Sequence, residues 1–310
     1  MFKLPLASTF LLIISGFVAS SAPARQLDKP DTVQNFPAGP YPRALAFDGT
    51  SIWVANGDGG TLTKLRASDG VKEGTFPAGG DPSYLTFDGA NIWASGSLAG
   101  TVTKLRASDG ALLGTFTVGG QPMGLAWDGA NVWVADFDNS TVIKLRGSDG
   151  VILGTFPCGG GGPRPVLFDG TAIWVANALD HSVTKLSVSD GTLLGRTVVG
   201  GNPLSLAFDG TKVWVTDFNN DLVIGMRATD VKIKQAINVE KSPFGIAFDG
   251  ANIWTSGSDN TVSGFRTRNG TRLNTYPVGL YPTAVLFDGT SLWTANFSSN
   301  TVSKITRTAP

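Results

Sequence analysis

The sequence predicts an all-β protein, a seven-bladed β-propeller with four strands per blade, closed by an N-terminal strand that completes the last blade. Three observations lead to this prediction. A turn triplet of an aromatic residue, Asp and Gly occurs seven times, at steps of 39 to 41 residues. A Trp stands six residues after the aromatic residue of every triplet. No segment shows the 3.6-residue apolar period of an amphipathic helix. The triplets begin at Phe47, Phe87, Trp127, Phe168, Phe208, Phe248 and Phe287, and the tryptophans are Trp53, Trp93, Trp133, Trp174, Trp214, Trp254 and Trp293.

Each repeat contains four short runs of β-forming residues. In the third repeat these runs cover 123–127, 131–135, 141–146 and 152–156, and Asp-Gly turns or Gly-rich loops separate them. An Asp-Gly pair between apolar runs is a hairpin signal, because Gly accepts the positive φ that tight turns need. Four strands in about 40 residues are typical of a propeller blade. The repeats start near residues 41, 81, 121, 162, 202, 242 and 281.

The two ends of the sequence complement each other. The seventh repeat stops after its third strand at 301–305, so its fourth strand is missing. Residues 32–38 resemble the fourth-strand segment at 75–79, since both contain Phe-Pro-Ala before Gly. We predict that 32–38 pairs with the last blade and closes the ring, which would leave no exposed strand edge there.

Residues 1–24 differ from the repeats and read as a signal peptide. Lys3 precedes an apolar run at 11–19, and Ala22-Pro23-Ala24 supplies the small residues that signal peptidase favours. A membrane anchor is the alternative, but the short run favours cleavage. We therefore expect a single propeller domain over 25–310, without a further membrane span, that is secreted, periplasmic or on the cell surface.

The composition excludes several classes of function. The 24 basic side chains balance 24 acidic ones, so no basic surface for nucleic acid is expected. One Cys excludes a disulfide framework and a Cys-based zinc site, and one His excludes a paired-His metal motif. Cys158 aligns with Ala or Val in other repeats and is expected to be a small buried hydrophobe. His181 aligns with Gly, Ser, Asp and Asn, so we expect it at a loop tip.

The repeat resembles known propeller families. The segments 293–302 and 174–177 look like the repeat of YVTN-type β-propellers, and the Phe-Asp-Gly turn before each Trp is similar to repeats of virginiamycin B lyase (streptogramin lyase) and its relatives. The resemblance covers 32–305 and implies the fold. In the lyases, catalysis depends on histidines and on a magnesium-binding glutamate on one face. This chain has a single His, and neither Glu73 nor Glu240 lies in a loop after a second strand, so none of those residues carries over.

The candidate site is the face where second strands end and first strands begin. Asp and Asn are frequent there, and loops are where propellers usually bind ligands. The candidate residues are Asn56, Asp81, Gln121, Asp136, Asn177, Asn202, Asp217, Tyr281 and Asn296, with Arg43, Arg164 and Phe244 nearby. Asp136, Asp138 and Asp217 could hold Ca²⁺ or Mg²⁺, but Asp and Asn are common in solvated turns, and that explanation is favoured. The seven tryptophans recur in every blade, which indicates packing rather than a carbohydrate or quinone platform.

Three functions remain open. The leading one is a non-catalytic, monomeric binding scaffold that needs no cofactor and takes a protein, glycan or small molecule on this face, because no acid/base or nucleophile constellation is visible. The alternative is an enzyme, either a streptogramin lyase-like C–O lyase or a metal-dependent lactonase-like hydrolase, using a divalent cation on the same face. The third is a structural module of the cell surface or envelope.

Overall fold

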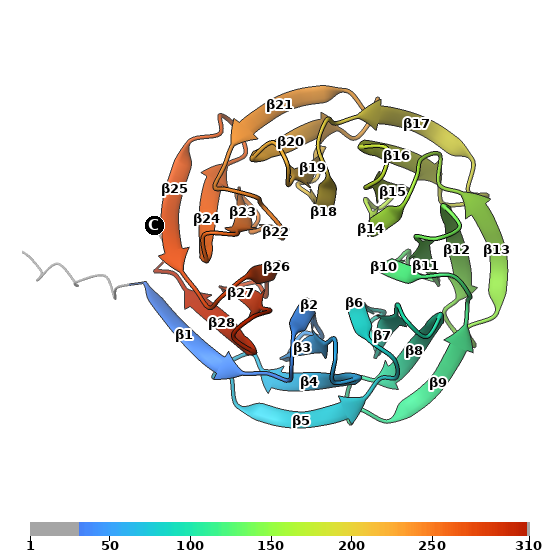
Figure 1. Ribbon diagram of the computed structural model, residues 1–310, viewed down its shortest axis with the longest axis horizontal. Helices are drawn as coiled ribbons and strands as arrows, with labels where there is room; N and C mark the ends of the chain where they lie inside the picture. The colour runs from blue at the N-terminus through green and yellow to red at the C-terminus, as the bar shows by residue number, and fades with distance from the viewer. Residues whose placement is uncertain (1–30, 309–310) are drawn as a thin grey trace, which may run out of the picture.

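The computed structural model describes residues 31–308, so the predicted signal peptide at 1–24 lies outside the described residues. Residues 31–308 form 28 strands and no helix, arranged as seven antiparallel four-stranded sheets around a central axis (Figure 1). The predicted seven-bladed propeller is confirmed. No helix in this range is long and apolar enough to cross a membrane.

Each blade runs from an inner first strand to an outer fourth strand (Figure 1). The first strands are β2 (Pro42–Phe47), β6 (Pro82–Phe87), β10 (Pro122–Trp127), β14 (Pro163–Phe168), β18 (Pro203–Phe208), β22 (Ile246–Phe248) and β26 (Pro282–Phe287). The second strands are β3 (Ser51–Asn56), β7 (Asn91–Gly96), β11 (Asn131–Asp136), β15 (Ala172–Asn177), β19 (Lys212–Asp217), β23 (Asn252–Gly257) and β27 (Ser291–Asn296). The third strands are β4 (Thr61–Arg66), β8 (Thr101–Arg106), β12 (Thr141–Arg146), β16 (Ser182–Ser187), β20 (Leu222–Arg227), β24 (Thr261–Arg266) and β28 (Thr301–Thr306). The fourth strands, from blade 1 to blade 7, are β5 (Lys72–Pro77), β9 (Leu112–Thr117), β13 (Ile152–Pro157), β17 (Leu193–Val198), β21 (Ile233–Asn238), β25 (Arg272–Pro277) and β1 (Thr32–Pro37).

The strand register gives the propeller two different faces. In blade 1, Pro42 pairs with Asn56, Asn56 with Thr61 and Thr61 with Pro77, so these four residues lie along one edge of the sheet. We call this edge of the ring the loop face, because the Gly-rich loops between blades lie there. The opposite edge carries the Asp-Gly turns, and we call it the turn face.

The ring closes through the two ends of the described chain. Strand β1 pairs with β28 in register from Thr32↔Thr306 to Pro37↔Thr301, and Phe36 packs on Trp293 with ring centroids 5.9 Å apart. The prediction that 32–38 completes the seventh blade is therefore confirmed. Asp31 secures the join, since it accepts hydrogen bonds from the Tyr276 hydroxyl of blade 6 (2.6 Å) and from the Thr308 backbone N–H (2.8 Å).

The turn triplet and the Trp form one structural unit. In blade 4, Oδ1 of Asp169 accepts the backbone N–H groups of Thr171 and Ala172, while Oδ2 accepts the indole N–H of Trp174 at 2.7 Å. The same indole-to-aspartate bond occurs in the six other blades at 2.7–2.8 Å. All seven indoles are buried. The tryptophans thus pack the blades, as their regular recurrence predicted.

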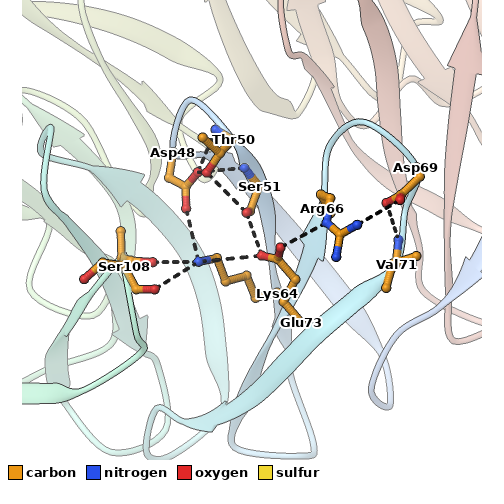
Figure 2. Close-up of polar contacts among 10 residues, drawn as sticks. Asp48, Thr50, Ser51, Lys64, Arg66, Asp69, Val71, Glu73 and Ser108 are labelled. Atoms are coloured by element: carbon orange, nitrogen blue, oxygen red, sulfur yellow. Dashed lines mark hydrogen bonds and ion pairs between the residues drawn. The ribbon is translucent and has the colours of Figure 1, made fainter.

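A lysine links most blades to the next blade on the turn face. Lys64 lies over the ring of Trp53, and its ammonium donates to the carbonyl oxygen of Ala107 in blade 2 at 2.9 Å. Figure 2 shows this ammonium among Asp48, Glu73 and the backbone of Ser108. Equivalent lysines bridge to the following blade in four other blades: Lys104, Lys144, Lys185 and Lys304. Such cation–π contacts combined with a buried carbonyl acceptor tie neighbouring sheets together.

Candidate functional site

A central cavity of about 470 Å³ opens along the axis of the propeller. Its wall consists of first-strand residues from all seven blades, of Phe244 and Tyr281 from the loops before β22 and β26, and of Phe297 from the loop after β27. The first strands approach each other closely, since a Cβ on Gly124 would lie 2.2 Å from the carbonyl oxygen of Arg164. We call the end of this cavity at the loop face the channel mouth.

Five of the predicted site residues do not face the mouth. Asn56, Asp136, Asn177, Asp217 and Asn296 end their second strands, and all five are buried. Three of them accept a backbone N–H from the neighbouring Gly-rich loop: Asn56 from Gly39 (3.0 Å), Asp136 from Gln121 (3.2 Å) and Asp217 from Gly201 (3.0 Å). The loop folds over each side chain, and a Cβ on Gly39 would lie 2.5 Å from Cγ of Asn56. These side chains therefore hold the loops in place, and the expectation of an Asp/Asn-rich binding surface is corrected for these five.

The other four predicted residues lie in the loops that lead into first strands. Asp81 accepts a charged hydrogen bond from Arg43 at 2.7 Å and another from the Ser97 hydroxyl at 2.9 Å. Gln121 and Asn202 are half-buried, and Tyr281 is 40% exposed. Of these four, Tyr281 contributes to the wall of the cavity.

The three aspartates considered for a cation do not come together. Asp136 lies in blade 3 and Asp217 in blade 5, with blade 4 between them, and Asp138 is exposed. Each buried carboxylate already has partners, since Asn139 donates to Asp136 at 2.7 Å and Asn220 donates to Asp217 at 2.8 Å. Over residues 31–308 no group of three His, Cys, Asp or Glu side chains is placed to hold a metal ion. These aspartates therefore do not fit a shared Ca²⁺ or Mg²⁺ site.

Aromatic side chains gather at the channel mouth, where Phe244, Tyr281 and Phe297 line the cavity. Five rings form a continuous series from blade 5 to blade 1, with neighbouring centroids 4.8 to 5.9 Å apart. In order they are Phe218, Phe244, Tyr281, Phe297 and Tyr41. We call this series the aromatic arc. Tyr41 and Tyr281 are each 40% exposed, so the arc offers ring surface to a ligand.

Two arginines supply the positive charge of the mouth. Arg43 is partly neutralised, because it pairs with Asp81 at 2.7 Å and lies 3.8 Å from Asp58. Arg164, in blade 4, has its guanidinium 5.3 Å from the ring centroid of Phe137 and has no ion pair with any residue of 31–308. Its Nε is buried without a hydrogen-bond partner among those residues. Both guanidiniums act on Tyr84, whose pKa is raised by burial and lowered less strongly by Arg164 and Arg43.

The single His and the single Cys lie away from the mouth. His181 is exposed at the turn between β15 and β16 with a φ of 57°, as expected for a loop tip. Cys158 is fully buried, and burial raises the pKa of its thiol, so it packs as a small apolar side chain.

Sequence reasoning missed three aromatic residues, of which Phe297 lines the mouth and the other two pack against Arg164 and Phe244, which line it. Phe137, Phe218 and Phe297 each stand four residues after the repeat Trp, where the other blades carry Gly57, Ser97, Ala178 and Ser258. An aromatic side chain in only three of seven equivalent positions is the signal that could have found them.

Solved structures with the same architecture include lyases. Virginiamycin B lyase from Staphylococcus aureus, in a catalytically inactive form with quinupristin, matches with a TM-score of 0.78 and 16% identity over 89% of this chain and 99% of that one. A streptogramin B lyase matches with a TM-score of 0.76 and 17% identity over 89% and 97%. Kuenenia stuttgartiensis hydrazine synthase matches with a TM-score of 0.77 and 19% identity over 87% and 96%.

At these identities the similarity establishes the fold alone, and at that level the predicted resemblance to the lyases is confirmed. No protein-family model matches the sequence, and no curated protein matches it.

Proposed function

We propose that this protein is an exported binding propeller that holds a small molecule at the channel mouth and does not transform it. The observation that carries the proposal is that rings of the aromatic arc and Arg164 line the same cavity, and that the charge of Arg164 has no partner among residues 31–308. A concave, largely apolar cavity with few polar groups is the usual form of a small-molecule site. The ligand we expect has a planar apolar body and a carboxylate.

The acidic groups of the loop face support binding rather than catalysis. A general base must reach the proton that it removes. Asp136 and Asp217 are buried under the Gly-rich loops, and Asp81 is engaged by Arg43 and Ser97. Tyr84, whose pKa is raised, is protonated at neutral pH and can donate a hydrogen bond to a carboxylate.

A lyase remains the second candidate, because lyases share this fold over most of the chain. Only the shared architecture supports this candidate, and no residue of this chain is assigned to lyase chemistry. Cleavage of a streptogramin by the purified protein, with or without added Mg²⁺, would favour the lyase and overturn the non-catalytic proposal.

Calorimetric titration with indole-3-acetate tests the site. We expect binding that Arg164→Gln weakens about tenfold or more, because a charged hydrogen bond contributes roughly 1.5–3 kcal/mol. Phe297→Ala should weaken binding as well, through loss of ring contact. The matched control is Arg106→Gln, which removes an arginine on the turn face. Equal affinity of the Arg164→Gln variant and the unaltered protein would refute the proposed site.

A further inference from the structure

A second cavity, of about 740 Å³, lies on the turn face between blades 6 and 7. Its wall includes Trp254, Leu273 and Tyr276 of blade 6 and Arg307 of blade 7. It lies at the join of the ring, where Asp31 and Thr308 also line it. None of these residues belongs to the channel mouth.

The cavity has a cause in the closure of the ring. In five blades the third-strand lysine crosses to a carbonyl in the following blade, next to the turn between its third and fourth strands. Blade 7 has no such turn, because its third strand, β28, ends near the C-terminus and its fourth strand, β1, comes from the N-terminus. Blades 5 and 6 carry Gly225 and Gly264 in the lysine position. Arg307 reaches back instead, 4.6 Å from the ring centroid of Trp254, and donates to Asp249 at 2.7 Å.

Blade 6 also differs from the other blades in charge at this face. In four blades an arginine at the end of the third strand pairs with an aspartate three residues later: Arg66–Asp69, Arg106–Asp109, Arg146–Asp149 and Arg227–Asp230. In blade 6 the arginine is Arg266, and Asn269 replaces the aspartate. Asn269 keeps the turn hydrogen bond, accepting the N–H of Thr271 at 3.1 Å, but it cannot neutralise Arg266. Arg268 adds a second charge where four other blades have Ser.

These two arginines have no partner within residues 31–308. Neither Arg266 nor Arg268 forms an ion pair or a side-chain hydrogen bond there, and both are exposed and line the cavity. The two acids of the wall are already engaged. Hydrogen bonds, led by the one from Tyr276, lower the pKa of Asp31. Burial alone would raise the pKa of Asp249, but the bonds from Trp254, two backbone N–H groups and Arg307 lower it.

Part of the wall is aromatic and aliphatic, beside polar residues such as Asn252 and Asn274. Trp254 and Tyr276 are stacked, with centroids 5.8 Å apart and planes inclined by 28°, and Leu273 lies beside them. A cavity of this volume is in the range that encloses a small organic molecule. Free guanidiniums at its rim favour an oxyanion, because their N–H groups match two oxygens at once.

We infer that this cavity, which we call the seam pocket, binds a small molecule with an oxyanion (phosphate, sulfate or carboxylate) on a planar apolar body. Arg266 and Arg268 hold the oxyanion, and the wall of Leu273 and Tyr276 receives the body. The inference does not depend on the channel mouth, since the two cavities share no lining residue.

Calorimetric titration of the full chain with 1-naphthyl phosphate tests the seam pocket. We expect binding that weakens about tenfold in the double variant Arg266→Gln/Arg268→Gln and several-fold in Asn269→Asp. The second variant restores the aspartate of the other blades and preserves the turn hydrogen bond, so it neutralises Arg266 without threatening the fold. Affinity unchanged in both variants would overturn the inference, as would the absence of binding at millimolar probe.

Matched variants and probes separate the alternatives. Arg106→Gln, which removes a paired arginine at the equivalent position of blade 2, should leave the affinity unchanged. Arg164→Gln should also leave it unchanged, and a loss there would place the probe in the channel mouth and overturn the seam pocket. Neutral 1-naphthol should bind at least tenfold more weakly, and equal binding would refute recognition of an oxyanion. Binding of 1-naphthoate shows whether a carboxylate suffices as the oxyanion. Binding of inorganic phosphate shows whether the apolar body is needed, and tighter binding of inorganic phosphate than of 1-naphthyl phosphate would refute the role of the apolar wall.

Discussion

Glu240 is buried in the loop between β21 of blade 5 and β22 of blade 6, at a position where the other loops carry Gly. It is 4% exposed and occupies the space beside Gly257, where a Cβ would lie 2.2 Å from its Cγ. In most blades the sizes are reversed, with Gly in the loop and Asn or Asp at the end of the second strand. The Thr255 hydroxyl donates to one carboxylate oxygen of Glu240, while the other has no hydrogen bond and lies 3.7 Å from Arg272.

Burial raises the pKa of Glu240 to about 7 from the ordinary 4.5, against the smaller opposing effects of Thr255 and Arg272, and Asp259 raises it further. A carboxyl pKa that is higher in the folded protein than in the unfolded chain does not lower the stability at a pH below the unfolded pKa, because the carboxyl is protonated in both states there. The cost grows as the pH rises from 4.5 to about 7 and is then constant. At roughly 1.4 kcal/mol per pH unit, it reaches about 3 kcal/mol above pH 7.

Glu240→Gln should therefore stabilise the protein at neutral and alkaline pH and have little effect in acid. Urea unfolding followed by Trp fluorescence should give a gain of about 3 kcal/mol in the free energy of unfolding at pH 9 and less than about 1 kcal/mol at pH 5. The control is Glu73→Gln, which removes ion pairs with the buried Lys64 and the exposed Arg66 and should cost a similar amount at both pH values. A Glu240→Gln gain that does not change with pH would refute the assignment of a buried, ionising carboxyl.

Three further stability predictions concern the repeat and its closure. Asp169→Asn places an amide N–H against the backbone N–H groups or the indole N–H of Trp174 and should lower the free energy of unfolding by about 2–4 kcal/mol. The control is Asp149→Asn, which alters an exposed ion pair and should lower it by less than about 1 kcal/mol. Equal losses in urea unfolding would contradict the role of the triplet. In all seven triplet aspartates, hydrogen bonds outweigh burial and lower the pKa. The stability that the ionised aspartates contribute is therefore present above pH 4 and is lost as the pH falls below it. The melting temperature should drop steeply from pH 5 to pH 3, and a constant melting temperature over this range would contradict the assignment. Deletion of 25–38 removes β1 and should lower the melting temperature sharply, and an unchanged value would show that the ring does not need its N-terminal strand.

The fold could be predicted because its determinants are local and repeated. The Asp-Gly turn, the Trp six residues after the aromatic and the missing fourth strand are all visible in the order of residues. The binding surface was harder to predict from the sequence. Asn56 and Asp217 end strands at the correct face, but their side chains bond the Gly-rich loop instead of facing the mouth, and the direction of a last strand residue depends on how that loop folds over it.

The aromatic arc illustrates what a linear repeat cannot show. Phe218 and Tyr41 are far apart in the sequence, yet they end one continuous series because the ring brings blades 5, 6, 7 and 1 side by side. These aromatic side chains become neighbours only because the propeller closes. The residues that form the candidate site differ from their equivalents in other blades. Comparing the seven equivalent positions within one chain identifies them.

That comparison also separates two kinds of departure in blade 6. Gly264 has an equivalent elsewhere in the ring, because blade 5 carries Gly225 in the lysine position although the turn of blade 6 that follows it is intact. Asn269 and Arg268 have no such equivalent in another blade, and the turn that carries them is intact and keeps its hydrogen bond to Thr271. Loss of the neutralising aspartate leaves Arg266 beside Arg268 and costs the turn an ion pair that four other blades keep. A ligand oxyanion supplies the charge that the turn itself lacks, so the same two residues that the fold leaves unexplained are the ones on which the seam pocket depends.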